Sequence, residues 1–586
     1  MAETLISPGI LLRENDLSQI SEGPIAAGAA LIGPTVIGPV NIPTIVRSYS
    51  DYKSKFGGAF VSGGQNYEYL TSMAALNYFE QGGNTLLVTR VASGSYEPAT
   101  ASIMASNPNT NVSFVLETLS VGNIMNNSGS VVSGSLVSGS TANVRWEVAA
   151  ASSASGQFTL LIRRGDDGPQ NKTILETWTN LSLDPNQSNY IAYVIGDQKE
   201  VQLTDEFGNA YLQTSGSYIN KSRYVRVKSV NSPTPNYFDS NGTVNPAYTG
   251  SLPVVGSGSV HGAFAGGTGA IWGCYGVSAL NMFQDIPTQT SVAGTPASNM
   301  QGVFADSYTN AIALLRNAEA YDFNIIYAPG INNQNAASAV SSIVTLAQDR
   351  GDCIAVVDMT GYGQSMTTVT AQAATYDNSY AATYFPWLQV RSRETGKMNF
   401  VPPSTIVPAI YEYNDKVAAE WFAPAGLNRG NLATVLRPER RLSLQERNFL
   451  YQGKVNPIAA FSGVGTVIYG QKTLQARASA LDRVNVRRLL ISLKRYIKRV
   501  AEDLVFEPNT QVTRNKFLNQ VNPYLEFVQQ RQGLYAFQVI MDDSNNTADV
   551  IDRNQLVGAI YLQPTRVAEF IQLDFNILPT GAQFGA

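Results

Sequence analysis

The clearest hydrophobic pattern in the chain lies near its C-terminus, between residues 482 and 507. Apolar residues recur there every three or four positions, which is the spacing of one face of an α-helix. Asp482 is suited to cap the start of this helix, and Glu507-Pro508 would stop it. Basic residues fill most of the other positions. The predicted apolar face consists of Val486, Leu489, Leu490, Leu493, Ile497, Val500 and Leu504.

A second amphipathic helix is predicted directly after the first. Its apolar residues lie on one side between Phe517 and Val528. Pro523 is expected to kink this helix, because proline cannot donate the backbone hydrogen bond, and Gly533 is expected to end it.

Three strand-like runs follow, at residues 534–541, 556–563 and 567–577. Residues 542–546 read Asp-Asp-Ser-Asn-Asn, a dense turn signal that would join the first two runs as a hairpin. The third run alternates apolar and polar positions, as a strand with one buried face does. Its apolar positions are Ile571, Leu573, Phe575 and Ile577.

Helical and strand-like patterns alternate in two separate parts of the chain, residues 25–92 and 259–430. Such alternation predicts an α/β domain with a parallel sheet. Residues 93–258, which lie between them, are rich in Ser, Asn, Gly and Thr and lack helical periodicity. We therefore expect an α+β multidomain protein: a discontinuous α/β middle domain, a large β-rich insertion, and a C-terminal α+β domain at residues 431–566.

The two ends of the chain are expected to be extended arms, at residues 1–24 and 567–586. Ser7-Pro8-Gly9 forms a turn signal, and the apolar run behind it can continue as a strand. An extended segment cannot satisfy its own backbone hydrogen bonds, so it must pair with a sheet. That sheet belongs either to the same chain or to a neighbouring copy, and the residues alone leave both readings open.

Composition limits the classes of function. The chain has 586 residues, a formal net charge of -4 and only 14% charged residues, which argues against a whole-chain nucleic-acid binder. Its two cysteines, Cys274 and Cys353, cannot build a disulfide framework. The first residues lack the features of a signal peptide, and no run of 18 apolar residues occurs. We expect synthesis in the cytoplasm, no membrane insertion and no nucleic-acid partner.

Candidate chemistry is sparse. The single histidine, His261, cannot by itself form a triad or a metal cluster. The glycine-rich residues 256–269 superficially resemble a phosphate-binding loop but lack its Lys-Ser/Thr. Asp166-Asp167 and Asp542-Asp543 are paired acids in turns, where solvated side chains are expected ahead of a bound cation. We therefore expect no catalytic residue, cofactor or metal.

Several short motifs follow one another in the last hundred residues: VNVRRLL, FEPN, TRNKF, PYL, DD-NNT and VIDRN-LVG. Residues 421–430 read WFAPAGLNRG, and SYSDYKSKFGG and NYFEQGGNTLLVTRV occur near the N-terminus. In this order the motifs resemble the tail sheath proteins of contractile, T4-like myophages. The resemblance is looser in the insertion, which is similar to sheath domains that decorate the outside of the tail.

The resemblance implies a structural protein and not an enzyme. A sheath subunit polymerises as stacked hexameric rings around the tail tube and contracts to drive the tube through the host envelope during genome delivery. Its partners would be other copies of itself, the tail tube protein, the baseplate and the tail terminator or neck proteins. It would be assembled in the host cytoplasm and end in the virion. The sheath of a secretion system or a bacteriocin particle is the alternative, and an α/β enzyme with a β insertion is a third reading.

The resemblance also assigns roles to the two arms, because sheath subunits exchange strands. The hairpin of the C-terminal domain would accept strands from neighbouring subunits through Phe537, Val539, Ile560 and Leu562. The strands donated to neighbours would contain Ile10, Leu11, Leu12 and Arg13 at one end and Phe570, Ile571, Leu573 and Phe575 at the other.

A basic cluster accompanies the first C-terminal helix. Residues 472–499 contain nine lysines and arginines and one acid. A solvated helix face is one reading. In the sheath family this domain lies innermost, so the resemblance implies that part of the cluster faces the tube, while the rest binds acids of its own subunit. The candidates are Arg487, Arg488, Lys494, Arg495, Lys498 and Arg499.

Overall fold

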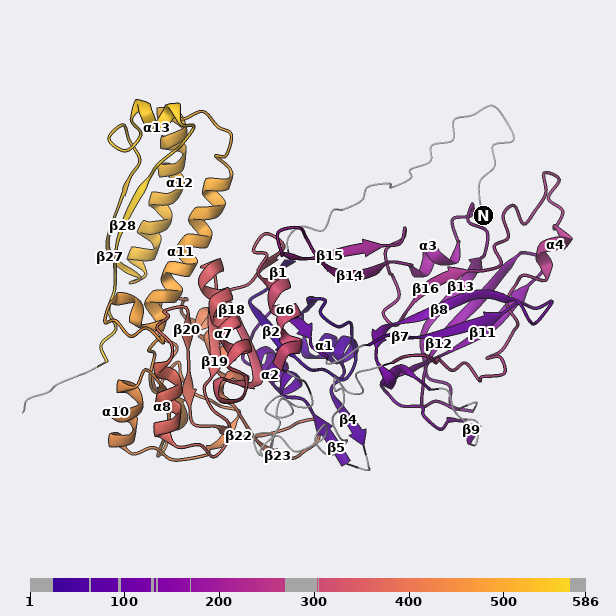
Figure 1. Cartoon of the computed structure of the whole chain (residues 1–586), viewed down its shortest axis with the longest axis horizontal. Helices are drawn as coiled ribbons and strands as arrows, with labels where there is room; N and C mark the ends of the chain where they lie inside the picture. The colour runs from indigo at the N-terminus through magenta and orange to yellow at the C-terminus, as the bar shows by residue number, and fades with distance from the viewer. Residues whose placement is uncertain are drawn as a thin grey trace, which may run out of the picture.

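The computed structural model describes residues 25–62, 65–92, 96–127, 131–132, 135–168, 170–268, 303 and 305–569. These residues form three parts in a row (Figure 1). The C-terminal helices and hairpin stand at one end, an α/β part lies in the centre, and a β-rich part lies at the other end. The mixed α/β fold predicted from the sequence is confirmed.

A six-stranded sheet forms the centre of the molecule. It joins strands from residues 29–90 with strands from residues 325–382, so two distant parts of the chain share one sheet. All neighbours are parallel except β3, which runs antiparallel to β6 at one edge. Parallel strands are covered on both faces, which explains their almost unbroken apolar sequence. In sheet order the strands are β20 (Ala381–Ala382), β19 (Ile354–Asp358), β18 (Ile325–Asn332), β2 (Ala29–Gly33), β6 (Leu86–Arg90) and β3 (Thr44–Val46).

Helices cover both faces of this sheet. Alternate residues of each strand point to opposite faces, so Ala30 and Ile326 pack in one core while Leu31 and Ile325 pack in the other. The first core includes α6 (Tyr308–Leu315), α7 (Asn333–Arg350) and α8 (Met366–Ala374). The second includes α1 (Tyr49–Phe56), α2 (Leu70–Glu80) and α9 (Val407–Val417).

The central sheet contains a buried carboxyl group that should make stability depend on pH. Asp358 ends β19, and its carboxylate accepts a hydrogen bond of 2.5 Å from the Ser404 hydroxyl and one of 3.2 Å from the Ser404 backbone N–H. Burial raises the pKa of Asp358 to about 7, against the opposing effect of these hydrogen bonds. The folded protein therefore holds this proton more tightly than the unfolded chain does.

We expect the free energy of unfolding to fall as the pH rises from 5.5 to 8, by about 2 kcal/mol from this group. The stability is present at low pH and is lost as the pH passes through the raised pKa of Asp358. Urea unfolding of the wild type and of Asp358→Asn at both pH values measures the effect. Between pH 5.5 and 8, the free energy of unfolding of the variant should fall by about 2 kcal/mol less than that of the wild type. An identical pH dependence of the two proteins would contradict the assignment.

The β-rich part consists of two three-stranded antiparallel sheets that enclose one apolar core. A separate hairpin of this part reaches back to the centre, where Ala210 and Leu212 pack in the core of α6. Gln202 of the hairpin also donates a 3.0 Å hydrogen bond to the Asn310 carbonyl. One sheet contains β7 (Pro98–Met104), β8 (Val112–Val121) and β16 (Val225–Val230). The other contains β11 (Val144–Ser152), β12 (Gln157–Arg164) and β13 (Ile174–Ser182). The hairpin consists of β14 (Lys199–Thr204) and β15 (Ala210–Ser215).

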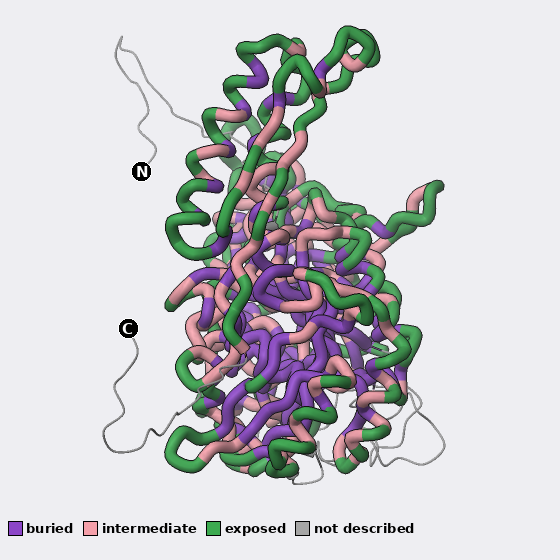
Figure 2. The backbone as a smooth tube through the Cα atoms, turned by 90° about the vertical axis from the view of Figure 1, so that its left-hand side faces the viewer, coloured by how far each residue is buried: buried purple, intermediate pink, exposed green. Residues whose placement is uncertain are grey.

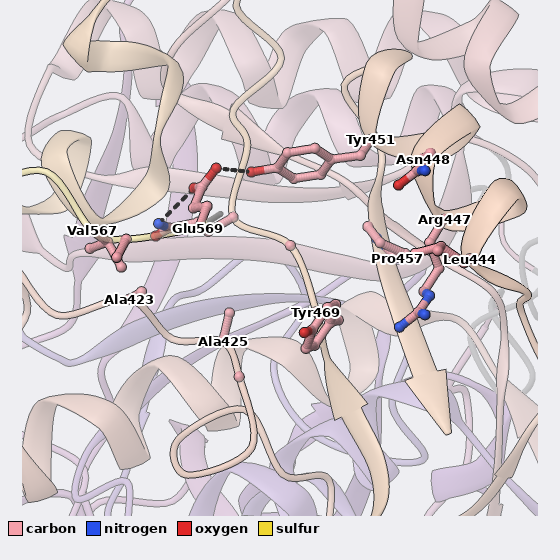
Figure 3. Close-up of a pocket in the computed structure, with 14 residues that line it drawn as sticks. Ala423, Ala425, Leu444, Arg447, Asn448, Tyr451, Pro457, Tyr469, Val567 and Glu569 are labelled. Carbon is pink, nitrogen blue, oxygen red and sulfur yellow. Dashed lines mark hydrogen bonds between the residues drawn. The ribbon is translucent and has the colours of Figure 1, made fainter. Parts of the chain in front are cut away.

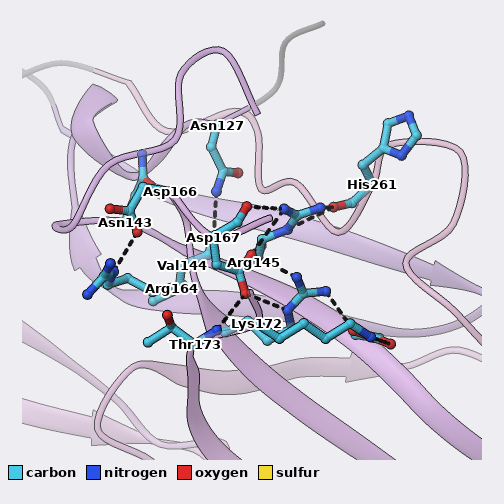
Figure 4. Close-up of polar contacts among 12 residues, drawn as sticks. Asn127, Asn143, Val144, Arg145, Arg164, Asp166, Asp167, Lys172, Thr173 and His261 are labelled. Atoms are coloured by element: carbon cyan, nitrogen blue, oxygen red, sulfur yellow. Dashed lines mark hydrogen bonds and ion pairs between the residues drawn. The ribbon is translucent and has the colours of Figure 1, made fainter. Parts of the chain in front are cut away.

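An acid in this part is structural, which corrects the expectation of a solvated turn at Asp167 (Figure 4). The Asp167 side chain is fully buried and accepts hydrogen bonds from Arg163 at 2.7 and 2.8 Å, from Arg145 at 3.1 Å and from the Thr173 backbone N–H at 3.1 Å. Arg145 also donates to the backbone carbonyl of His261. The network ties two loops to the β11–β12 ladder, and these donors offset the desolvation of the carboxylate.

Smaller elements connect the centre to the C-terminal part. Two short strands follow one another here, because Pro386 lies between β21 (Tyr384–Phe385) and β22 (Leu388–Arg391) and cannot donate to a ladder. β22 pairs with β23 (Met398–Val401) and β24 (Val435–Pro438). β21 pairs with β25 (Asn456–Phe461), which pairs in turn with β26 (Gly465–Ile468).

The C-terminal part contains two long helices and a hairpin. The elements are α11 (Val484–Glu502), α12 (Gln511–Gln530), β27 (Leu534–Ile540), α13 (Ala548–Asp552) and β28 (Ala559–Pro564). Pro523 lies inside α12, which continues through it as one helix. Figure 2 shows that backbone at this end is mostly exposed or half-buried, whereas buried backbone concentrates in the centre of the molecule.

Two local expectations were wrong here. Asp482 does not cap α11: the helix begins at Val484 with Arg483 at its N-cap, and Asp482 lies in a 3₁₀ turn, where it forms a 3.0 Å ion pair with Arg483. The turn at residues 542–546 does not join the two strands directly, because α13 lies between them. Asn546 closes this longer connection by bonding to the backbone of Asp542 and of Val557.

Candidate assembly site

The hairpin β27–β28 is the exposed sheet of the C-terminal part. Phe537 pairs with Leu562 and Val539 with Ile560 across the antiparallel ladder. These four side chains are partly buried against the apolar core of α11 and α12. Within the described part of the chain each of the two strands pairs only with the other, so both outer edges carry backbone groups outside a ladder. Such edges are suited to accept a further strand.

A cleft of about 850 Å³ opens beside β28. It is lined by Ile560 and Leu562 of the hairpin and, from the central part, by Ala318, Glu319, Asp322 and residues 350–352. The apolar residues of α11 that line it are Leu490, Leu493 and Ile497. Lys494, Arg495, Lys498, Arg499 and Glu502 add charged groups to the same cleft. The space beside β28 is thus partly apolar and partly charged, as an alternating strand requires.

Neither predicted donor strand can be placed. Ile10 to Arg13 and Phe570 to Phe575 lie outside the described residues. The described chain begins at β1 (Ile25–Ala26), which pairs in parallel with β17 (Tyr321–Asp322), and it ends at Glu569.

Two of the six candidate cations are buried and belong to the part of the cluster that is bound within its own subunit. Arg488 has a side chain that is 3% exposed and donates to both carboxylate oxygens of Asp415 in α9, at 2.8 and 2.5 Å. Burial alone would lower the pKa of Arg488, but Asp415 more than offsets this, so its pKa is raised. Arg487 lies with its guanidinium 4.0 Å from the centre of the Tyr380 ring, and burial lowers its pKa. Both cations therefore fasten α11 to the central part.

The other four candidates lie further along α11. Arg495 is half-buried and forms an ion pair with Asp322. Lys494 is exposed and donates a 3.2 Å hydrogen bond to the Tyr380 hydroxyl. Lys498 is 61% exposed and lies 3.7 Å from Glu502, and Arg499 is also exposed. Of the six candidates, Lys494, Lys498 and Arg499 are thus the ones that are exposed to solvent on α11.

A second apolar face of α11 explains the buried arginines. Val484 and Ile491 pack in the central core and not in the C-terminal one. Arg488 is four residues after Val484 and three before Ile491, so it lies on the same face. This spacing was visible in the sequence. The acid that neutralises Arg488, Asp415, is 73 residues away along the chain and carries no local signal.

The remaining candidates are metal ligands, the cysteines and the paired acids. Among the described residues no group of three or more His, Cys, Asp or Glu side chains could hold a metal ion. Cys353 is buried, and burial raises the pKa of its thiol far above the ordinary value. The pair Asp542 and Asp543 lies in an exposed turn. Where the structure describes helices, none combines the length and the apolar character needed to cross a membrane.

Comparison with known proteins agrees with this arrangement. Residues 301–474 match the model of the phage tail sheath protein central domain, and residues 477–577 match that of the phage tail sheath C-terminal domain. The chain is 32% identical over 330 residues to the tail sheath protein of Vibrio phage KVP40. The aligned residues make up 55% of this chain and 47% of that protein. It is 30% identical over 314 residues to the tail sheath protein of Enterobacteria phage T4. Here the aligned residues make up 50% of this chain and 48% of that protein.

The chain therefore spans about half the length of these two relatives. A solved structure of a sheath tail protein from Listeria innocua shares the fold, with a TM-score of 0.51 at 12% identity, over 93% of this chain and 96% of that one. The two matched domains follow each other directly and together contain the second half of the central sheet, α11 and the hairpin. Residues 301–577 of this chain are therefore similar to the central and C-terminal domains of phage tail sheath proteins.

Proposed function

We propose that this chain is the structural subunit of a contractile tail sheath, which polymerises as stacked hexameric rings around a tail tube. Contraction of the sheath drives the tube through the host envelope during genome delivery. The observation that carries the proposal is the match of residues 301–577 to two sheath domains, together with the hairpin β27–β28, whose outer edges pair with no other strand among the described residues. The tube protein, the baseplate and the terminator or neck proteins are the proposed partners, and the virion is the proposed destination.

Strands from neighbouring subunits complete the hairpin sheet in this proposal. The cleft beside β28 supports this role, because a strand placed there would cover Leu490 and Ile497 and pair with the free edge of β28. Each added strand makes roughly four to six backbone hydrogen bonds, each worth about 0.5–1.5 kcal/mol net. The donors are the segments around Ile10–Arg13 and Phe570–Phe575.

Exchanged strands also explain how a sheath can contract without coming apart. The strands keep subunits connected while the folded parts rotate from one packing to another. The extended packing is then a kinetically trapped state, and new contacts between subunits supply the energy of contraction. No nucleotide is consumed in this scheme.

Electron microscopy of the purified full chain tests the proposal. Hollow tubes or rings of defined diameter are the expected result. Discrete, unassembled particles at every protein concentration and salt would contradict it and would favour the alternative of an α/β enzyme with a β insertion.

The exposed cations of α11 should strengthen assembly around the tube. Replacement of Lys498 and Arg499 by Glu is expected to reduce the amount of sheath that co-sediments with tail tubes, most strongly at low salt. The reason is that exposed ion pairs contribute about 0.2–1 kcal/mol each and are screened by salt, but the contact repeats in every subunit. Arg553→Glu is the control, because Arg553 is exposed at the C-terminal end of α13 and pairs with Asp549 of that helix. Equal co-sedimentation of all three proteins at low and high salt would argue against a tube-facing role.

A further inference from the structure

The last described residue, Glu569, accepts several hydrogen bonds, among them one from Tyr451 (Figure 3). Arg483 donates to both of its carboxylate oxygens, from Nε at 2.7 Å and from a terminal nitrogen at 2.9 Å. The Tyr451 hydroxyl donates at 2.7 Å, and the Gln471 side chain donates at 3.1 Å. Four hydrogen bonds from three residues therefore converge on one carboxylate.

These donors come from three separate elements. Tyr451 lies in α10 (Leu444–Gln452), Gln471 follows β26, and Arg483 is the N-cap of α11. The ammonium group of Lys472 lies beside these donors, 4.3 Å from the centre of the Tyr451 ring. We call Tyr451, Gln471 and Arg483 the carboxylate cradle. It is built from parts of the chain that are fixed by the fold, independently of the segment that it holds.

The cradle stabilises the ionised form of Glu569. The side chains of Glu569 and Arg483 are 18% and 24% exposed. Burial by itself raises the pKa of Glu569, but the hydrogen bonds from Arg483, Tyr451 and Gln471 outweigh burial, so its pKa is lowered. Charge-assisted and bidentate contacts of this kind are among the strongest polar contacts in proteins.

We propose that the carboxylate cradle is the fixed mount of the C-terminal arm: it holds Glu569 of its own subunit and sets the point from which residues 570–586 leave for a neighbour. This inference rests on the proposed sheath function and refines it, because the arm was expected to begin at residue 567. Val567 and Ala568 line a pocket of their own subunit together with Glu569. In this proposal the exchanged segment starts after Glu569 and not at residue 567.

A mount has two consequences for assembly. It fixes the start of the arm, so the neighbour's hairpin must lie within reach of the 17 residues that follow Glu569, roughly 60 Å when fully extended. It also limits the volume that the arm explores, which raises its effective concentration at one particular neighbour. If Glu569 were not held, the arm could reach the edges of other sheets, including those of its own subunit.

The test uses the full chain with Glu569→Ala, in comparison with the wild type and with Glu526→Ala. Glu526 is an exposed acid on α12 and serves as the matched control. Trypsin cleavage after Arg566, which is exposed, reports on the mount in unassembled protein, measured by mass spectrometry of the released peptide 567–586. Glu569→Ala should release this peptide about tenfold faster than the wild type, and Glu526→Ala at the wild-type rate.

Assembly is then followed by sedimentation and electron microscopy. Glu569→Ala should remain folded by circular dichroism but form few ordered tubes, and the double variant Glu569→Arg with Arg483→Glu should recover part of both properties. Wild-type rates of cleavage and normal tubes in Glu569→Ala would overturn the mount and leave the sheath function intact. Failure of the wild type itself to assemble would overturn the sheath function, while the cleavage rates would still decide whether the mount exists.

Discussion

A chain that lacks residues 1–15 should fold and stay a monomer under conditions in which the full chain forms tubes. The deleted residues precede the described part of the chain, which already contains complete apolar cores, so the free energy of unfolding should change little. Loss of the donor strand removes roughly four to six intersubunit backbone hydrogen bonds per subunit. Sedimentation velocity and electron microscopy measure the outcome, which is expected to be complete loss of tubes.

Single substitutions make this result specific. Leu12→Pro should abolish assembly like the deletion, because proline lacks the N–H group that a ladder needs. Thr4→Pro is the matched control outside the proposed strand and should assemble normally. Ordinary tubes from the deleted chain would show that the N-terminal segment is not a donor strand, and the open edges of the hairpin would then need another explanation.

Arg488→Met should destabilise the protein by about 3–5 kcal/mol, because it leaves the Asp415 carboxylate buried without its partner. The pair joins α11 to α9, so the loss should loosen the contact between the C-terminal and central parts. Urea unfolding monitored by tryptophan fluorescence measures the change. This substitution removes a cation, yet we expect its effect on folding to exceed any effect on tube binding.

Two further variants check the cause. Lys516→Met removes an exposed cation from α12 and should change the free energy of unfolding by no more than about 0.5 kcal/mol. The double variant Arg488→Met with Asp415→Leu should regain much of the lost stability, because neither charge is then left unpaired. A full loss that persists in the double variant would show that Arg488 acts through packing and not through its charge.

Local patterns predicted the elements of this protein well where burial is simple. The strands β18 and β19 read as apolar runs because both of their faces are covered, and α11 and α12 show a helical apolar spacing because one side packs in a core. The hairpin strands were placed to within a few residues for the same reason. Helix ends were less predictable: Asp482 has the chemistry of a cap but lies in the preceding turn.

The site was predicted less completely, because its electrostatics depend on partners far apart in sequence. Arg487 and Arg488 look like exposed residues of a basic helix until Tyr380 and Asp415 are placed beside them. Asp167 looks like a turn residue until Arg145 is brought from the neighbouring strand. The residues around Glu569 do not indicate that its partner is Arg483, which lies 86 positions earlier in the chain.

The shared sheet at the centre of the molecule constrains how the protein is made on the ribosome. The strands β2 and β6 emerge early, but β18, which lies beside β2, emerges only after about 230 more residues have been added. At roughly 5–20 residues per second, the nascent chain carries an unfinished apolar layer for roughly 10–50 seconds. During that time the β-rich insertion can fold on its own core, while the edge of β2 that later pairs with β18 stays without its neighbour.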